Sequence, residues 1–187
     1  ISFSRNFGKE AGIYAGLEHA SGEYIALIDA DLQQRPEIVR EMVAFLDKNP
    51  DYDMVAAYQD RRNEGKVLSF FKKRFYSIIN HLSDVNLHSD ASDFRTFRRS
   101  VADSILELKE YHRFSKGIFA WVGFDTKWLP YENVERPLGT SKWSFWGLVR
   151  YAYSGFIAFA TTPLRGVIYL GLIITICSFI YAATIYI

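Results

Sequence analysis

The stretch EYIALIDADLQ, residues 23–33, decides the fold class of this chain. Its apolar part, residues 23–28, has the length and composition of a buried strand, and it stops abruptly at Asp29-Ala30-Asp31. In a sheet covered by helices, ligands bind at the carboxyl ends of the strands. We therefore expect the two acids to lie at a sheet edge that is open to a ligand.

The segments on both sides of this stretch alternate between strand and helix patterns. Small residues recur on successive turns of residues 8–20, and Pro36 suits the first turn of the helix that follows the acids. This alternation predicts an α/β sheet with crossover helices. The expected strands are residues 1–4, 23–28, 54–58, 93–97 and 124–131, and the expected helices are residues 8–20, 36–48, 70–82, 101–108 and 113–122.

The composition excludes several classes of protein. Of the 187 residues, 49% are hydrophobic, which is too apolar for a disordered protein. The 22 basic and 21 acidic residues give a net charge of +1, so no overall field favours nucleic acid as a partner. Cys177 is the one cysteine and lies in an apolar run, which leaves no disulfide framework and no thiolate cluster for zinc.

Residues 167–187 contain no charged side chain. A helix of this length spans about 31 Å, the thickness of the hydrocarbon core of a bilayer. The soluble alternative is a core helix buried on every side. Residues 143–159 are rich in Trp, Tyr and Phe, which suits the membrane interface. Arg150 and Arg165 precede the apolar run, so the positive-inside tendency places the preceding domain in the cytoplasm.

Asp29, Asp31 and Gln33 place three oxygen-bearing side chains on alternate positions after the buried strand. Two carboxylates and an amide oxygen suit a hard divalent cation that shares its ligand shell with substrate phosphates. Such a cation stabilises the charge that builds on a diphosphate leaving group. In the alternative interpretation the acids only cap the helix that begins near Pro36, where negative charge favours the positive end of the helix dipole.

Basic residues lie where they can receive an anion. Arg5 and Lys9 flank Gly8 at an expected strand-to-helix junction, where backbone N–H groups are exposed. A carboxylate flanked by arginines stays ionised, which makes Asp93 the candidate general base. The loop RPLGTSK, residues 136–142, joins a cationic segment to the interfacial aromatics, at the height of a lipid phosphate. Taken separately, each basic run is also compatible with an ordinary solvated surface.

Four motifs in order resemble the polyisoprenyl-phosphate glycosyltransferases: SRNFGKEAG at residues 4–12, DADLQ at 29–33, SDFRTFRR at 92–99 and RPLGTSKW at 136–143. This family includes dolichol-phosphate mannose synthases and bacterial undecaprenyl-phosphate glucosyltransferases, and the match is closest to the bacterial members. The resemblance implies a GT-A fold with a Rossmann-like sheet, an inverting mechanism and a Mg²⁺ or Mn²⁺ cofactor. The family's first strand precedes SRNFGK, so we expect a catalytic domain that lacks its N-terminal part.

The resemblance also implies roles for individual residues. Asp29, Asp31 and Gln33 would hold the cation and the donor diphosphate, and Asp93 would be the catalytic carboxylate that faces the acceptor phosphate. The residues implied to contact phosphates of the donor or of the lipid are Arg95, Arg113, Arg136, Ser141 and Lys142, with Arg5 and Lys9 as further candidates.

The expected organisation is a cytosolic catalytic domain at residues 1–142, an interfacial segment at residues 143–165 and a transmembrane helix at residues 166–187. We expect a hexosyltransferase of the cytoplasmic membrane that moves glucose, N-acetylglucosamine or a similar sugar from a nucleotide-sugar to undecaprenyl phosphate. UDP is the favoured nucleotide, and modification of a cell-envelope glycan is the expected role. A homo-oligomer is an option, because membrane enzymes of this kind often form one.

Three alternatives stay open. An enzyme of the dolichol-phosphate mannose synthase type would use GDP-mannose. A processive polysaccharide synthase would share the sheet and the acids, although such enzymes resemble one another in a Gln-x-x-Arg-Trp motif that does not occur here. A structural or transport protein of the membrane would need only the apolar helix, but it would leave DADLQ and Asp93 unexplained.

Overall fold

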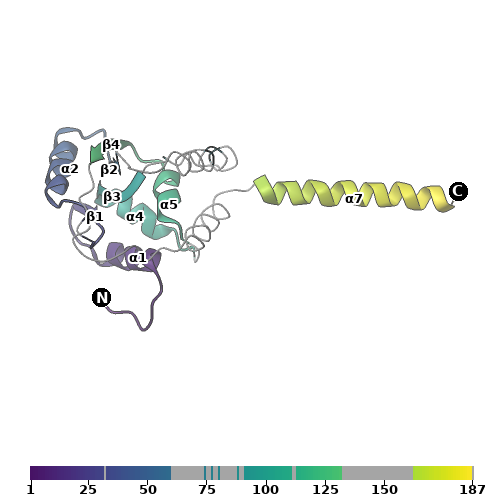
Figure 1. The fold of residues 1–187 in the computed structure, drawn as a ribbon, viewed down its shortest axis with the longest axis horizontal. Coiled ribbons are helices and arrows are strands. Elements are labelled where there is room, and N and C mark those ends of the chain that lie inside the picture. Colours follow the sequence, from purple (N-terminus) through teal and green to yellow (C-terminus); the bar gives the residue numbers. More distant parts are fainter. Residues whose placement is uncertain are drawn as a thin grey trace.

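A mixed sheet forms the centre of the fold (Figure 1). The computed structural model describes residues 1–31, 33–59, 74, 77, 80, 88, 91–110, 113–131 and 162–186. Within these residues the sheet has four strands in the order β1-β3-β2-β4. The strands are β1 (Tyr24–Leu27), β2 (Met54–Gln59), β3 (Ala91–Arg98) and β4 (Thr126–Tyr131).

Strand β3 runs against both of its neighbours. It pairs antiparallel with β1, where Leu27 lies opposite Arg95, and antiparallel with β2, where Met54 lies opposite Phe97. Strands β2 and β4 are parallel. The carboxyl ends of β1, β2 and β4 therefore lie at the same edge of the sheet as the amino end of β3, and we call this edge the site edge.

Helices cover both faces of the sheet, which confirms the expected α/β class (Figure 1). Helix α2 (Glu37–Lys48) packs on one face, and α1 (Lys9–His19), α4 (Arg99–Glu107) and α5 (Ser115–Trp121) pack on the other. The core on the α2 face contains Met42, Leu46, Val55, Ala57, Phe94 and Tyr131. The core on the opposite face contains Leu17, Ile25, Met54, Phe97, Val101, Ala102, Ile105, Ile118 and Phe119.

Helix α2 shows how the sequence specifies one of these layers. Its apolar side chains recur on one face, and Met42 and Leu46, one turn apart, are fully buried against the sheet. Pro36 is the N-cap residue, and no side-chain hydrogen bond caps that end. A favourable effect of Asp29 and Asp31 on the dipole of this helix stays a prediction.

Helix α7 (Thr162–Tyr186) stands apart from the sheet and its helices (Figure 1). Residues Arg165–Ile185 are long and apolar enough to cross a bilayer, and no part of this stretch is buried. Thr175 and Ser178 donate their hydroxyl hydrogens to carbonyl oxygens of the preceding turn, at 2.9 and 2.8 Å. These two hydroxyls therefore have partners within the helix that would persist in lipid.

The structure differs from the sequence-based expectation at both ends of the described chain. Residues 1–8 form neither helix nor strand, and Ile1 and Phe3 are exposed, so the strand expected at residues 1–4 is wrong. An alternating pattern makes a strand only where a neighbouring strand binds its backbone, and none of the described strands pairs there. Helix α7 begins at Thr162, before the expected start at residue 166. Most of the helix expected at residues 70–82, and residues 143–161 of the expected interfacial segment, lie outside the described residues.

Candidate functional site

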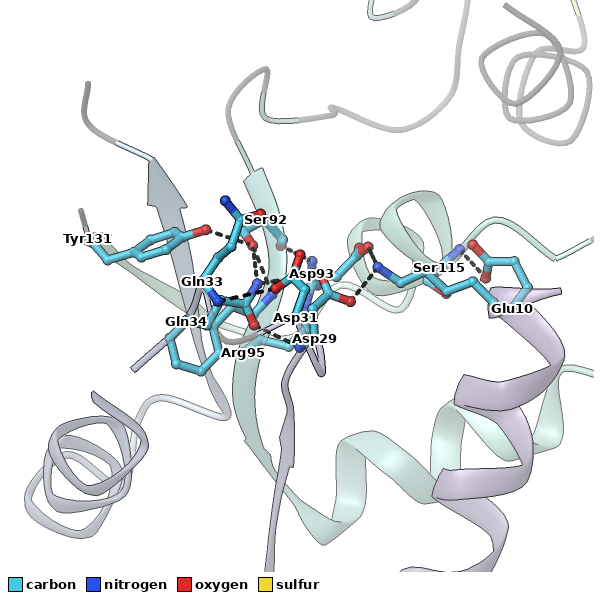
Figure 2. A network of polar contacts seen from close by, with 12 residues as sticks. Glu10, Asp29, Asp31, Gln33, Gln34, Ser92, Asp93, Arg95, Ser115 and Tyr131 are labelled. Atoms are coloured by element: carbon cyan, nitrogen blue, oxygen red, sulfur yellow. Dashed lines mark hydrogen bonds and ion pairs between the residues drawn. The ribbon is translucent and has the colours of Figure 1, made fainter. Parts of the chain in front are cut away.

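Three segments that are far apart in the sequence meet at the site edge (Figure 2). Asp29 lies two residues after the end of β1, Asp93 is the third residue of β3, and Lys9 is the first residue of α1. The antiparallel direction of β3 is what brings the two acids together, because its amino end lies beside the carboxyl end of β1. The motifs SRNFGK, DADLQ and SDFR therefore contribute to one site.

Lys9 joins the two acids. Its ammonium lies 2.8 Å from Oδ1 of Asp29 and 2.7 Å from Oδ2 of Asp93. Burial lowers the pKa of Lys9, but the two carboxylates outweigh it and raise the pKa above its ordinary value, so the side chain stays cationic. The lysine is placed by a tight turn, in which Gly8 has a φ of 87° and donates its N–H to Oδ1 of Asn6 at 2.9 Å.

Asp93 is the more enclosed of the two acids that Lys9 binds, with a side chain 12% exposed against 39% for Asp29. Burial raises the pKa of this carboxyl, but the positive charges of Lys116, Lys9 and Arg95 more than offset it and hold the pKa below its ordinary value. Oδ2 binds Lys9, whereas Oδ1 is buried and has no hydrogen-bond partner among the described residues. An ionised, buried oxygen of this kind can accept a hydrogen bond from a ligand.

A buried network on the other side of the edge fixes Asp29 (Figure 2). Gln34, which is 6% exposed, accepts the backbone N–H of Asp29 at 2.8 Å and donates its amide to Oδ2 of Asp29 at 3.5 Å. The same amide donates to Oγ of Ser92 at 3.3 Å, and the hydroxyl of Tyr131 donates to that oxygen at 3.3 Å. The ends of β1, β3 and β4 are thus connected by side chains.

The two acids after β1 fit a divalent cation in part. The carboxylate of Asp29 is 39% exposed, and Oδ1 of Asp31 accepts the backbone N–H of Gln33 at 3.3 Å, which turns the chain at the rim of the site. Across the described ranges, no three His, Cys, Asp or Glu side chains are grouped to hold a metal. Mg²⁺ characteristically uses one or two carboxylates together with substrate phosphates. The residues present fit that kind of shared shell.

The arginines implied to bind phosphate lie in different surroundings. Arg95 is 3% exposed, with its guanidinium over the ring of Phe119 at 4.1 Å and donating to the carbonyl of Ser92 at 3.0 Å. Arg5 is exposed and lies over the ring of Phe7. For both residues, contact with a phosphate stays a prediction.

Arg113 lies at the end of α4. Its guanidinium donates to the carbonyls of Leu108 and Ile105 and lies 4.6 Å from the centre of the Tyr14 ring. These contacts stabilise the carboxyl end of the helix, where backbone carbonyls lack helical partners. A phosphate contact of Arg113 also stays a prediction, and Arg136, Ser141 and Lys142 lie outside the described residues.

Sequence reasoning missed several residues of the site. Gln34 could have been suspected, because it follows DADLQ directly, but only the fold shows that it reaches Ser92. Lys116 carried no signal, since its position near Asp93 depends on how α5 packs. Glu10 accepts both the backbone N–H and the hydroxyl hydrogen of Ser115, and so connects the first turn of α1 to the first turn of α5 (Figure 2).

Comparison with known proteins agrees with the four motifs. The profile of the family described as Glycosyl transferase family 2 matches residues 1–106. The chain is 44% identical over 181 residues to CsbB of Bacillus subtilis (strain 168), covering 97% of the chain and 54% of that protein. It is 38% identical over 185 residues to the uncharacterized glycosyltransferase sll0501 of Synechocystis sp., covering 98% of the chain and 57% of that protein.

A third relative carries a more specific name. The chain is 37% identical over 183 residues to the bactoprenol glucosyl transferase of Shigella phage SfV, covering 98% of the chain and 59% of that protein. The chain therefore spans little more than half the length of these relatives. The resemblance drawn from the motifs is confirmed.

Proposed function

Because the chain belongs to glycosyl transferase family 2, we propose that it is the catalytic part of a membrane enzyme that transfers a hexose from a nucleotide-sugar to a polyisoprenyl phosphate. Relatives of the chain include proteins named bactoprenol glucosyl transferase. One of its helices is long and apolar enough to cross a bilayer. Since the chain spans little more than half of those relatives, the substrates and partners of the whole protein are part of this proposal.

One observation carries the proposal: a single ammonium, that of Lys9, binds both an acid after β1 and the acid at the start of β3. A transferase needs a place for the diphosphate of its donor and a second group that faces the nucleophile. Asp29 and Asp31, with Gln33, suit the first role, and Asp93 suits the second. A structural or transport protein gives no reason for this convergence.

In the proposed reaction, an oxygen of the acceptor phosphate attacks the anomeric carbon of the sugar. The bond from that carbon to the diphosphate breaks as the new bond forms, and the nucleoside diphosphate leaves with the electron pair. Mg²⁺ or Mn²⁺ held by Asp29, Asp31 and Gln33 would supply positive charge beside the diphosphate. The one-step attack from the opposite side inverts the anomeric configuration.

Asp93 would act on the acceptor. Because its pKa is held below the ordinary value, the carboxylate is ionised at neutral pH. Its buried Oδ1 can accept the hydrogen of a monoprotonated acceptor phosphate and orient the attacking oxygen. A phosphate oxygen is already anionic near neutrality, so orientation matters more here than removal of a proton.

The orientation in the membrane and the identity of the substrates belong to the same proposal. Arg150 and Arg165 precede the apolar helix, which favours a catalytic domain on the cytoplasmic side. UDP-glucose or UDP-N-acetylglucosamine and undecaprenyl phosphate are the substrates we propose first. The GDP-mannose reaction would appear as an alternative outcome of the same assay.

The proposal is tested with the full-length protein in detergent. Labelled nucleotide-sugars are incubated with undecaprenyl phosphate and a divalent cation, and transfer of label to the lipid is measured. We expect Asp31→Asn to abolish transfer and Asp93→Asn to lower kcat by about 100-fold or more while donor binding changes little. Asp103→Asn, which removes an exposed acid of α4, is the matched control. Rates near those of the wild type in both site variants, or retention of the anomeric configuration, would exclude the proposed roles.

A further inference from the structure

Lys9 occupies an acidic oxygen that the proposed metal ion would also need. The ammonium of Lys9 is within ion-pair distance of Asp29 Oδ1 and Asp93 Oδ2 at the same time. Oδ1 of Asp29 is also an oxygen that a divalent cation would use in the proposed function. A metal ion and an ammonium cannot share that oxygen closely without strong repulsion between the two positive charges. One of them must leave it when the other binds.

The surroundings of Asp29 are arranged so that its partner can change. Gln34 binds the backbone N–H and Oδ2 of Asp29, which leaves Oδ1 directed at Lys9. Gln34 thus holds the carboxylate of Asp29 in place whether Oδ1 binds the ammonium of Lys9 or a metal ion. The side chain of Lys9 is 41% exposed and has a flexible four-carbon stem, so its ammonium can move without a change in the backbone of α1.

We propose that Lys9 is an exchangeable counter-ion of the site: it neutralises Asp29 and Asp93 in the metal-free protein, and it releases Asp29 when a divalent cation binds. After the exchange, the ammonium keeps Asp93 as a partner and lies next to the position of the donor diphosphate. This inference rests on the proposed function, because the cation and the diphosphate belong to it. It gives the charge of Lys9 two opposite effects: it weakens binding of the metal ion in the absence of donor, and it strengthens binding of the donor once the metal ion is bound.

The opposite signs follow from linkage between binding sites. A positive charge that must be displaced weakens metal binding to the protein without donor, so its removal tightens that binding. The same charge attracts the donor diphosphate once the metal is in place, so its removal weakens donor binding. A residue that only supports the fold would weaken both.

The test measures Mn²⁺ binding to the full-length protein in detergent from the electron paramagnetic resonance signal of free Mn²⁺. Without donor, we expect Lys9→Met to bind Mn²⁺ about 10-fold more tightly than the wild type. In saturating Mn²⁺, we expect the same variant to bind UDP about 10-fold more weakly. Lys9→Gln is a second neutral variant, used if Lys9→Met does not fold. Lys9→Arg keeps the charge and should bind Mn²⁺ within about threefold of the wild type.

Lys116→Met is the matched control, because it removes another positive charge that acts on Asp93. We expect it to change Mn²⁺ affinity by less than about threefold. Mn²⁺ affinity that is unchanged or weaker in both neutral Lys9 variants would overturn the exchange while leaving the proposed function intact. Asp29→Asn and Asp31→Asn should each abolish the Mn²⁺ binding of the wild type. If they left it unchanged, or if the wild type bound no Mn²⁺, the metal role in the proposed function would fail, and the exchange with it.

Discussion

At the scale of single residues, the charge of Asp93 is set by its neighbours. Its pKa lies below the ordinary value because Lys116, Lys9 and Arg95 outweigh the effect of burial. A group whose pKa is lower in the folded than in the unfolded state stabilises the fold above its unfolded pKa, and this stabilisation is lost as the pH falls through the folded pKa. Asp93 therefore favours the fold at neutral pH and stops doing so only in acid.

The same lowered pKa predicts a pH profile. In the wild type we expect no loss of kcat/KM from protonation of Asp93 between about pH 5.5 and 8, because its pKa lies well below this range. Lys116→Met removes one of the charges that lower the pKa, so the acidic limb of its profile should move to higher pH. The measurement is transfer rate against pH for both proteins, and superimposable acidic limbs would contradict the assigned cause.

Gln34 gives a second prediction at this scale. Gln34→Glu keeps the shape of the side chain and the acceptor for the Asp29 N–H, but it cannot donate to Asp29 and Ser92. Because Asp29 is a ligand of the proposed cation, we expect kcat/KM for the proposed transfer to fall by about 10- to 100-fold, the range for groups that orient metal ligands. Tyr131→Phe removes only the outer contact to Ser92 and should cost less than about threefold. Equal losses in the two variants would argue against a role for the amide.

At the scale of elements, Arg98 connects a strand, a helix and a loop. Its guanidinium donates to the carbonyls of Leu46 and Tyr52 at 2.7 and 3.0 Å and to the hydroxyl of Tyr24 at 3.1 Å. Arg98 therefore binds the carbonyls at the carboxyl end of α2 and in the loop that follows it. Arg99 likewise donates to a backbone carbonyl, that of Gly22.

The two arginines form a matched pair for a stability measurement. Arg98→Met leaves the carbonyls of Leu46 and Tyr52 without their charged partner, and we expect it to destabilise the fold by about 2 to 3 kcal/mol. This corresponds to a fall in Tm of roughly 5 to 10 °C. Arg99 is more exposed at its contact, so Arg99→Met should cost less than about 1 kcal/mol. The check is thermal unfolding of both variants, and a similar Tm for the two would be inconsistent with this role.

Elements were predictable where the pattern is local. The strands containing Ile25 and Val55 and the helix containing Met42 appear close to the expected bounds, because apolar periodicity and Pro36 are read from neighbouring residues. The direction of β3 was not predictable, since alternation in SDFRTF is the same whichever way a strand runs. The acids Asp29 and Asp93 were found from their motifs, but their contact through Lys9 depends on that direction.

At the scale of the whole molecule, the described residues combine a sheet that carries the site edge with a long apolar helix, α7. The residues that connect Tyr131 to α7 lie outside the described part of the chain. The composition of α7 suits a bilayer. From Gly166 to Tyr186 it carries no charged side chain, and its described hydroxyls at Thr175, Ser178 and Thr184 bond to carbonyls of the same helix.

The apolar length of α7 should hold it in a bilayer, and a charged side chain near its middle should weaken its insertion. An arginine at the centre of a spanning helix costs about 2.5 to 3.5 kcal/mol in insertion. We therefore expect Ile174→Arg to lower the fraction of the chain that resists extraction of membranes with alkaline carbonate, whereas Ile174→Leu should leave it unchanged. If the arginine variant remained in the membrane to the same extent, α7 would not be the element that anchors this chain, and the lipid phosphate would have to reach Asp93 by another part of the protein.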